Sequence, residues 1–169
     1  MKTISIVRHA KAERPDAYPS DFERPLTERG HKDAQLLGAL IAQLEPPVDH
    51  LVSSSALRAA QTADRVASAL GFKKTIAWQE AAYLAGSTTL LELLQATPEA
   101  ADHVLIVGHN PGLEELADGL CTGTPNGNLL TLATATLAHL VVDISRWSQL
   151  HWGGGQLKLL IAAKMLRSL

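Results

Sequence analysis

Residues 3–9 of the sequence read TISIVRH. A short β-branched run that stops at charged and imidazole side chains is typical of a buried strand that ends at a functional edge. Two later segments repeat this arrangement: residues 49–52 lead through a serine turn to Arg58, and residues 104–107 lead to His109. The sequence therefore predicts three strands that each end beside ionisable residues.

Helical patterns lie between these predicted strands. Thr27 can cap a helix in which apolar residues recur at helical spacing as far as Leu44. A second helix is predicted over residues 57–70 and is ended by Gly71. Residues 11–26 contain three prolines and predict an irregular loop. The remaining predicted elements are a strand at 74–78, helices at 90–94 and 113–120, and late strands within 129–142 and at 157–161.

Strands that alternate with helices predict the α/β class, as a single-domain three-layer α/β/α sandwich with a mostly parallel central sheet. The 169 residues, of which 46% are hydrophobic, fit one domain that spans residues 1–169. In such sheets, ligands bind beyond the carboxyl ends of the strands. The three strand ends above therefore predict the place of a functional site.

Composition narrows the choice of partners. The 15 basic and 17 acidic residues nearly cancel, so we expect no general affinity for nucleic acid or for an anionic membrane. The longest apolar stretches, such as residues 137–142, are far shorter than the roughly 20 residues that cross a bilayer. The single cysteine, Cys121, cannot form an internal disulfide, and the N-terminal run lacks a signal-peptide layout, so we expect a cytoplasmic protein.

The residues at the three strand ends suit a phosphoryl group. Arginine presents a planar fork of donors that matches phosphate oxygens and can stabilise the charge of phosphoryl transfer. A neutral imidazole can attack phosphorus and hold it covalently. Because arginines would supply the positive charge, we expect no metal and no cofactor. The predicted pocket residues are Arg8, His9, Arg58 and His109.

These residues also lie in motifs that resemble those of the histidine phosphatase superfamily. Arg8-His9-Ala10 resembles the Arg-His-Gly signature of that superfamily, with Ala10 in place of its glycine. Residues 53–63 and 108–111 resemble its second and third phosphate-binding segments. The resemblance covers nearly the whole chain and implies a phosphoglycerate mutase-like fold.

The compact length and residues 21–30, DFERPLTERG, are similar to the SixA branch of the superfamily. Members of that branch remove phosphate from phosphohistidine on signalling proteins. The resemblance implies that His9 is the nucleophile and that the phosphate is bound by Arg8, Arg58 and His109. Many phosphatases of the superfamily also use a glutamate as general acid, and Glu80 is the nearest candidate here.

Three functions are consistent with these residues. The first is a phosphatase of protein phosphohistidine, because an imidazole protonated on its other nitrogen leaves as a neutral ring and needs little help from an acid. The second is a phosphatase of a small phosphoester, with Glu80 as the acid. The third is a phosphate-binding adaptor without turnover. The other histidines have no motif around them, and we expect surface or hydrogen-bonded core positions for His31, His50, His103, His139 and His151.

Overall fold

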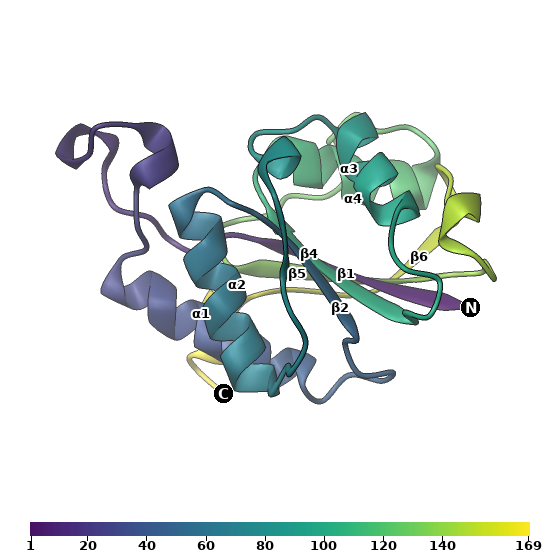
Figure 1. Cartoon of the computed structure of the whole chain (residues 1–169), viewed down its shortest axis with the longest axis horizontal. Helices are drawn as coiled ribbons and strands as arrows, with labels where there is room; N and C mark the ends of the chain where they lie inside the picture. The colour runs from purple at the N-terminus through teal and green to yellow at the C-terminus, as the bar shows by residue number, and fades with distance from the viewer.

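The computed structural model describes residues 1–169 and contains one six-stranded sheet with helices on both faces (Figure 1). The strands are β1 (Lys2–Arg8), β2 (His50–Ser54), β3 (Ala77–Gln79), β4 (His103–Gly108), β5 (Thr136–Val142) and β6 (Gly155–Ala162). The α-helices are α1 (Glu28–Ile41), α2 (Leu57–Leu70), α3 (Ser87–Gln95), α4 (Gly112–Thr122) and α5 (Ala163–Leu166). Four single-turn 3-10 helices are η1 (Pro15–Ala17), η2 (Asp21–Glu23), η3 (Glu80–Ala82) and η4 (Trp147–Gln149).

The strand order is β3-β2-β4-β1-β5-β6. Pairing is parallel from β3 through β2 and β4 to β1, and it is antiparallel from β1 to β5 and from β5 to β6. The sheet is therefore mostly parallel, as predicted. Because β2, β4 and β1 are neighbours that run in the same direction, their carboxyl ends meet at one edge of the sheet.

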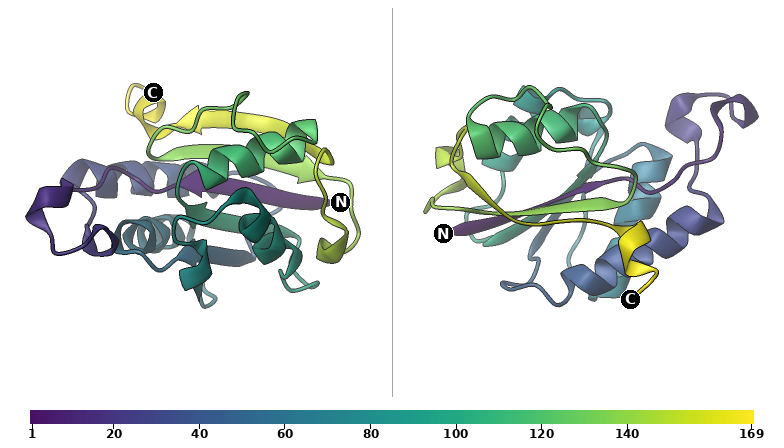
Figure 2. Two further views of the ribbon diagram at one scale, coloured as in Figure 1. Left: turned by 90° about the horizontal axis from the view of Figure 1, so that it is seen from above. Right: turned by 180° about the vertical axis from the view of Figure 1, so that it is seen from behind.

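Two apolar cores lie on opposite faces of the sheet, and Figure 2 shows the helices that cover them. Leu37 of α1 and Val66 of α2 pack on one face, while Leu90 of α3 and Leu116 of α4 pack on the other. All four side chains are fully or almost fully buried. The predicted three-layer α/β/α sandwich is confirmed, with α1 and α2 in one layer and α3 and α4 in the other.

The ends of α1 and α2 follow from local chemistry. The Thr27 side chain accepts a hydrogen bond from the Gly30 backbone N–H at 3.0 Å and so begins α1. Gly30 is required by a close approach, because a Cβ atom there would lie 2.3 Å from the Lys11 carbonyl oxygen. Helix α2 covers residues 57–70 as predicted and ends at Gly71, whose φ of 75° is left-handed.

Two of the predicted strands differ from the structure. The late strand begins only at Thr136, because α4 side chains occupy the backbone donors that precede it: Asp118 accepts from the N–H groups of Leu129 and Leu130, each at 2.8 Å. The strand predicted at 74–78 lies instead at residues 77–79, where it pairs with the end of β2. The predicted loop at 11–26, hereafter the 11–26 segment, is irregular apart from η1 and η2.

A buried polar chain crosses the sheet away from its carboxyl edge. The ring nitrogen Nδ1 of His103 lies 2.6 Å from the Pro46 carbonyl oxygen, so this nitrogen carries the proton. Nitrogen Nε2 of His103 then accepts from the Ser5 hydroxyl, whose oxygen accepts from His139 Nδ1, both at 2.9 Å. The two histidines are thus hydrogen-bonded core residues, as expected, and burial lowers the pKa of His103 to about 4.

The burial of neutral His103 in this row of hydrogen-bonded groups predicts that the protein loses stability in mild acid. Unfolded histidine has a pKa of about 6.5, so below that pH the unfolded chain binds a proton that folded His103 does not take up. The free energy of unfolding should fall as the pH drops from about 6.5 to about 4, with His103 accounting for up to about 3 kcal/mol. Urea unfolding between pH 7.5 and 4.5 measures the slope. His103→Gln should reduce the slope by the His103 contribution, whereas His151→Gln, at an exposed position, should not change it; equal slopes in both variants contradict the prediction.

No helix in the structure is both long enough and apolar enough to span a bilayer.

Candidate active site

The carboxyl ends of β1, β2 and β4 bring the predicted site residues together. His9 follows β1, and its backbone N–H donates to the carbonyl of Gly108, the last residue of β4, at 3.0 Å. His109 follows β4 and Arg58 lies on the first turn of α2 after β2. The four predicted residues Arg8, His9, Arg58 and His109 all line one pocket of about 440 Å³. That volume lies within the range of small-molecule sites.

The His9 imidazole is buried and oriented for attack through Nε2. Its Nδ1 lies 2.7 Å from the Ala10 carbonyl oxygen, which can only accept, so Nδ1 carries the proton and Nε2 carries the lone pair. Burial, together with the nearby guanidinium groups of Arg58, Arg8 and Arg24, lowers the pKa of His9 to about 4. His9 is therefore a neutral imidazole near pH 7, which is the nucleophilic form.

Arg58 places its guanidinium beside this lone pair. Its Nε donates to His9 Nε2 at 3.3 Å, and its side chain is only 3% exposed. Thr62 connects the two residues: its hydroxyl accepts from the Ala10 backbone N–H at 3.0 Å and donates to the Arg58 carbonyl at 2.7 Å. The end of β1 and the start of α2 are therefore held at a fixed separation.

Arg8 and His109 each contribute a buried nitrogen atom that no protein group bonds. Arg8 donates through Nη1 to the Leu132 carbonyl at 2.9 Å, but its Nε is buried without a partner. The His109 ring is 5.2 Å from the His9 ring, and its Nε2 bonds Ser54 Oγ at 2.8 Å while Nδ1 is buried without a partner. Unpartnered buried polar groups cost free energy, so their concentration here indicates a site built for a ligand.

Ala10 fits its place without strain. Leu84 and Ala135 are the non-glycine residues with positive φ in the structure, so the Ala10 backbone has a conformation open to any residue. Its methyl group is fully buried in the core that α1 and α2 cover. The alanine that replaces the signature glycine therefore packs as an ordinary core residue beside the nucleophile.

Asp21 belongs to the pocket although the sequence analysis assigned it no role there. Its carboxylate accepts from Arg58 Nη2 at 2.9 Å and from the Tyr83 hydroxyl at 2.5 Å. The hydrogen bond from Tyr83 and the guanidinium groups of Arg24 and Arg58 hold the pKa of Asp21 well below its usual range. The signal that could have revealed Asp21 is its position at the start of the run that resembles the SixA branch. Beyond the four predicted residues and Asp21, the pocket is lined by Lys11, Ala12, Arg24, Leu84, Asn110 and Thr134.

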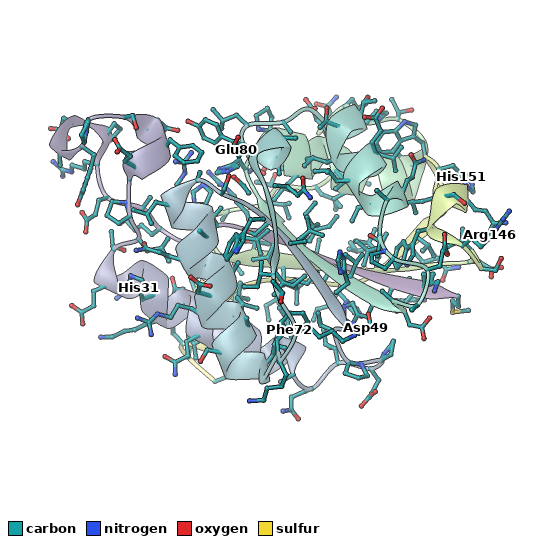
Figure 3. The ribbon with its side chains drawn as sticks, viewed as in Figure 1. His31, Asp49, Phe72, Glu80, Arg146 and His151 are labelled. Atoms are coloured by element: carbon teal, nitrogen blue, oxygen red, sulfur yellow. The ribbon has the colours of Figure 1, made fainter.

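Glu80, the candidate general acid, does not line this pocket. It lies on η3 and is exposed (Figure 3). His31 on α1 and His151 near the opposite end of the molecule also lie away from the pocket (Figure 3). His50 is the first residue of β2 and so lies at the other end of that strand from the site. Asp21 is thus the one carboxyl group among the lining residues.

This geometry matches the chemistry of phosphoryl transfer. A neutral imidazole lone pair faces a pocket whose lining includes four cations: Arg8, Lys11, Arg24 and Arg58. Guanidinium donors can stabilise the charge on the equatorial oxygens while the imidazole attacks phosphorus in line.

Comparisons with known proteins agree with this class of site. The model of the histidine phosphatase superfamily (branch 1) matches residues 4–85. An uncharacterized protein of Picosynechococcus sp. is 32% identical over 140 residues, which cover 81% of this chain and 83% of that protein. A structure described as a candidate phosphohistidine phosphatase SixA from Nakamurella multipartitia has a TM-score of 0.82 and 29% identity, with 95% of each chain covered. The protein histidine phosphatase SixA in complex with tungstate has a TM-score of 0.81 and 25% identity, with 97% of this chain and 99% of that chain covered.

The fold and the site thus define a phosphatase of the phosphoglycerate mutase-like kind, a hydrolase of phosphoryl compounds. The chain belongs to the histidine phosphatase superfamily, and within it to the SixA-type branch.

Proposed function

We propose that this phosphatase hydrolyses phosphohistidine on a protein through a covalent phosphoryl intermediate on His9. In this proposal the phosphoryl oxygens are bound by Arg8, Arg58 and His109, within a catalytic domain formed by residues 1–169. The guanidinium groups supply the positive charge, so the reaction needs no metal. The likeness to solved structures described as SixA phosphatases supports this substrate class. The single cysteine fits a reducing, cytoplasmic setting.

The observation that carries the proposal is the lack of a usable general acid in the pocket. Displacement of an alkoxide from a phosphoester needs a proton donor. Asp21 is ionised, because its pKa is lowered by its hydrogen-bond partners, and Tyr83 is a weak donor because its hydrogen bond to Asp21 raises its pKa. Glu80 does not line the pocket. A leaving group that departs without such a donor is therefore favoured, and a ring-protonated phosphohistidine provides one.

The proposed reaction has two steps. His9 Nε2 attacks phosphorus, the bond between phosphorus and the substrate nitrogen breaks, and the substrate ring leaves as neutral imidazole because its other nitrogen already carries a proton. Water then attacks phosphorus, the bond to His9 Nε2 breaks, and inorganic phosphate leaves while His9 returns to its neutral form. The protein thus contributes an oriented nucleophile and preorganised charge, which are the main sources of catalysis in phosphoryl transfer.

Phosphate release from a phosphohistidine protein and from an alkyl phosphate, measured with the intact enzyme and with Glu80→Gln, tests the choice of substrate. We expect faster release from phosphohistidine and rates within about twofold of each other for the two enzymes, since an exposed carboxyl outside the pocket takes no part. The phosphoester alternative predicts preference for the alkyl phosphate and a large loss in Glu80→Gln. The adaptor alternative predicts phosphate binding with no release from either compound.

A further inference from the structure

The 11–26 segment carries Asp21 to the pocket from outside the sheet. It leaves β1, projects beyond α1 and α2, and returns to begin α1 (Figure 1). Its base is fixed by the bridge between Ala12 and Leu26 and by the Leu26 N–H, which donates to Gln61 Oε1 at 2.7 Å. Between these anchors, Arg24 Nη1 donates to the Glu13 carbonyl at 2.8 Å. The segment therefore has a defined path that brings Asp21 against α2.

The acceptor capacity of Asp21 is fully used within the protein. Oδ1 accepts from Arg24 Nε at 3.0 Å and lies 2.9 Å from Arg24 Nη2, while Oδ2 accepts from Arg58 Nη2 and from the Tyr83 hydroxyl. The Asp21 backbone carbonyl also accepts from Arg58 Nη1 at 2.7 Å. A carboxylate has about four acceptor positions. Asp21 is thus committed to orienting neighbouring groups, and its low pKa leaves it without a proton to donate.

The Arg58 guanidinium has two edges with different partners. The outer edge, Nη1 and Nη2, donates to Asp21. The inner edge, at Nε, donates to His9 Nε2. Tyr83 supports this orientation from the side: its ring centre lies 5.8 Å from the Arg58 guanidinium carbon, and its ring meets that of His109 edge to face at 5.5 Å. The inner edge therefore remains aimed at the space in front of the nucleophile.

We propose that Asp21, supported by Tyr83, is a positioning residue that holds the outer edge of Arg58 so that the inner edge faces the phosphoryl group on its way to His9. Planar guanidinium donors stabilise a transition state only when the plane of the fork is fixed, and a misplacement of about 1 Å can cost about 10²-fold in rate. The proposal rests on the proposed function only in taking a phosphoryl group as the ligand.

Asp21→Asn tests this role, because it retains the size of the side chain and removes its charge. We expect kcat to fall at least tenfold, KM to change less than kcat, and the affinity for inorganic phosphate, measured by calorimetric titration, to weaken about tenfold. Asp21→Glu should recover part of kcat. The matched control is Asp16→Asn, at an exposed position of η1 in the same segment, which should leave all three quantities unchanged.

Tyr83→Phe provides a second test that does not depend on the folding of Asp21→Asn, since it removes one hydroxyl and retains the ring. It should lower kcat by a few-fold, because it removes the hydrogen bond that supports Asp21, and an unchanged kcat contradicts the supporting role of Tyr83. Where Asp21→Asn folds, the loss caused by Tyr83→Phe should be smaller in that background, because the two residues act through one hydrogen bond.

A competing role for Asp21 predicts the opposite change in phosphate affinity. If its carboxylate only competes with the ligand for Arg58, then Asp21→Asn will bind inorganic phosphate more tightly, and that result overturns the proposal. Unchanged phosphate affinity and kcat overturn it as well. If the intact enzyme releases no phosphate from any substrate, the proposed function fails, but the binding comparison still decides the role of Asp21.

Discussion

Replacing His9 with alanine should abolish the covalent intermediate and reduce turnover by about four to six orders of magnitude, as the loss of a nucleophile does in other enzymes with covalent intermediates. The lone pair of His9 Nε2 faces the pocket, since the proton on Nδ1 is donated to the Ala10 carbonyl. The measurement is acid-labile incorporation of labelled phosphoryl from a phosphohistidine protein, followed together with phosphate release.

The control for this variant is His31→Ala, which removes an imidazole on α1 outside the pocket and should label normally. Both variants should show the secondary structure of the intact protein by circular dichroism. Acid-labile label that persists in His9→Ala would remove His9 from the role of nucleophile.

Replacing Arg58 with alanine should give the second largest effect, a loss of about 10²- to 10³-fold in kcat. The change removes the donors beside His9 Nε2 and leaves the Asp21 carboxylate in the pocket with its partner from α2 missing. Arg58→Lys should recover little, because an ammonium group cannot bond His9, the Asp21 backbone carbonyl and the Asp21 carboxylate from one rigid plane. Initial rates over a range of phosphohistidine concentrations separate kcat from KM.

Arg65→Ala is the matched control for the arginine. Arg65 lies on the same helix, is exposed, and donates to His31 Nδ1 outside the pocket. Its loss should leave kcat within about twofold of the intact enzyme. A variant of Arg58 that retains kcat would show that its guanidinium does not stabilise the transition state.

The fold could be predicted from sequence wherever local chemistry decides the structure. The cap at Thr27 and the left-handed Gly71 set helix ends at single residues, and the three strand ends located the pocket. The late strand was predicted too long because its first apolar residues give their backbone donors to Asp118 and Glu114 of α4, a contact that no periodicity reveals.

The site could be predicted only in part, and for a similar reason. Arg8, His9, Arg58 and His109 lie at or shortly after the carboxyl ends of β1, β2 and β4, so topology alone brings them together. Asp21 and Tyr83 lie in short irregular pieces, η2 and the end of η3, and they meet only through the three-dimensional path of the chain. Glu80, the residue that the superfamily resemblance suggested as general acid, is exposed on η3 and does not line the pocket.

Two parts of the chain that contribute to the pocket differ in how firmly they are held: β1, which directly precedes His9, and the 11–26 segment, which carries Asp21. Strand β1 is paired on both sides, and all but one of its residues are buried, whereas η1 and η2 in the 11–26 segment bury no residue. Opening free energies in a protein range from nearly zero in exposed segments to the full unfolding free energy in central strands. We therefore expect the backbone of β1 to open only with global unfolding, whereas the 11–26 segment, which carries Asp21, should open at a lower free energy.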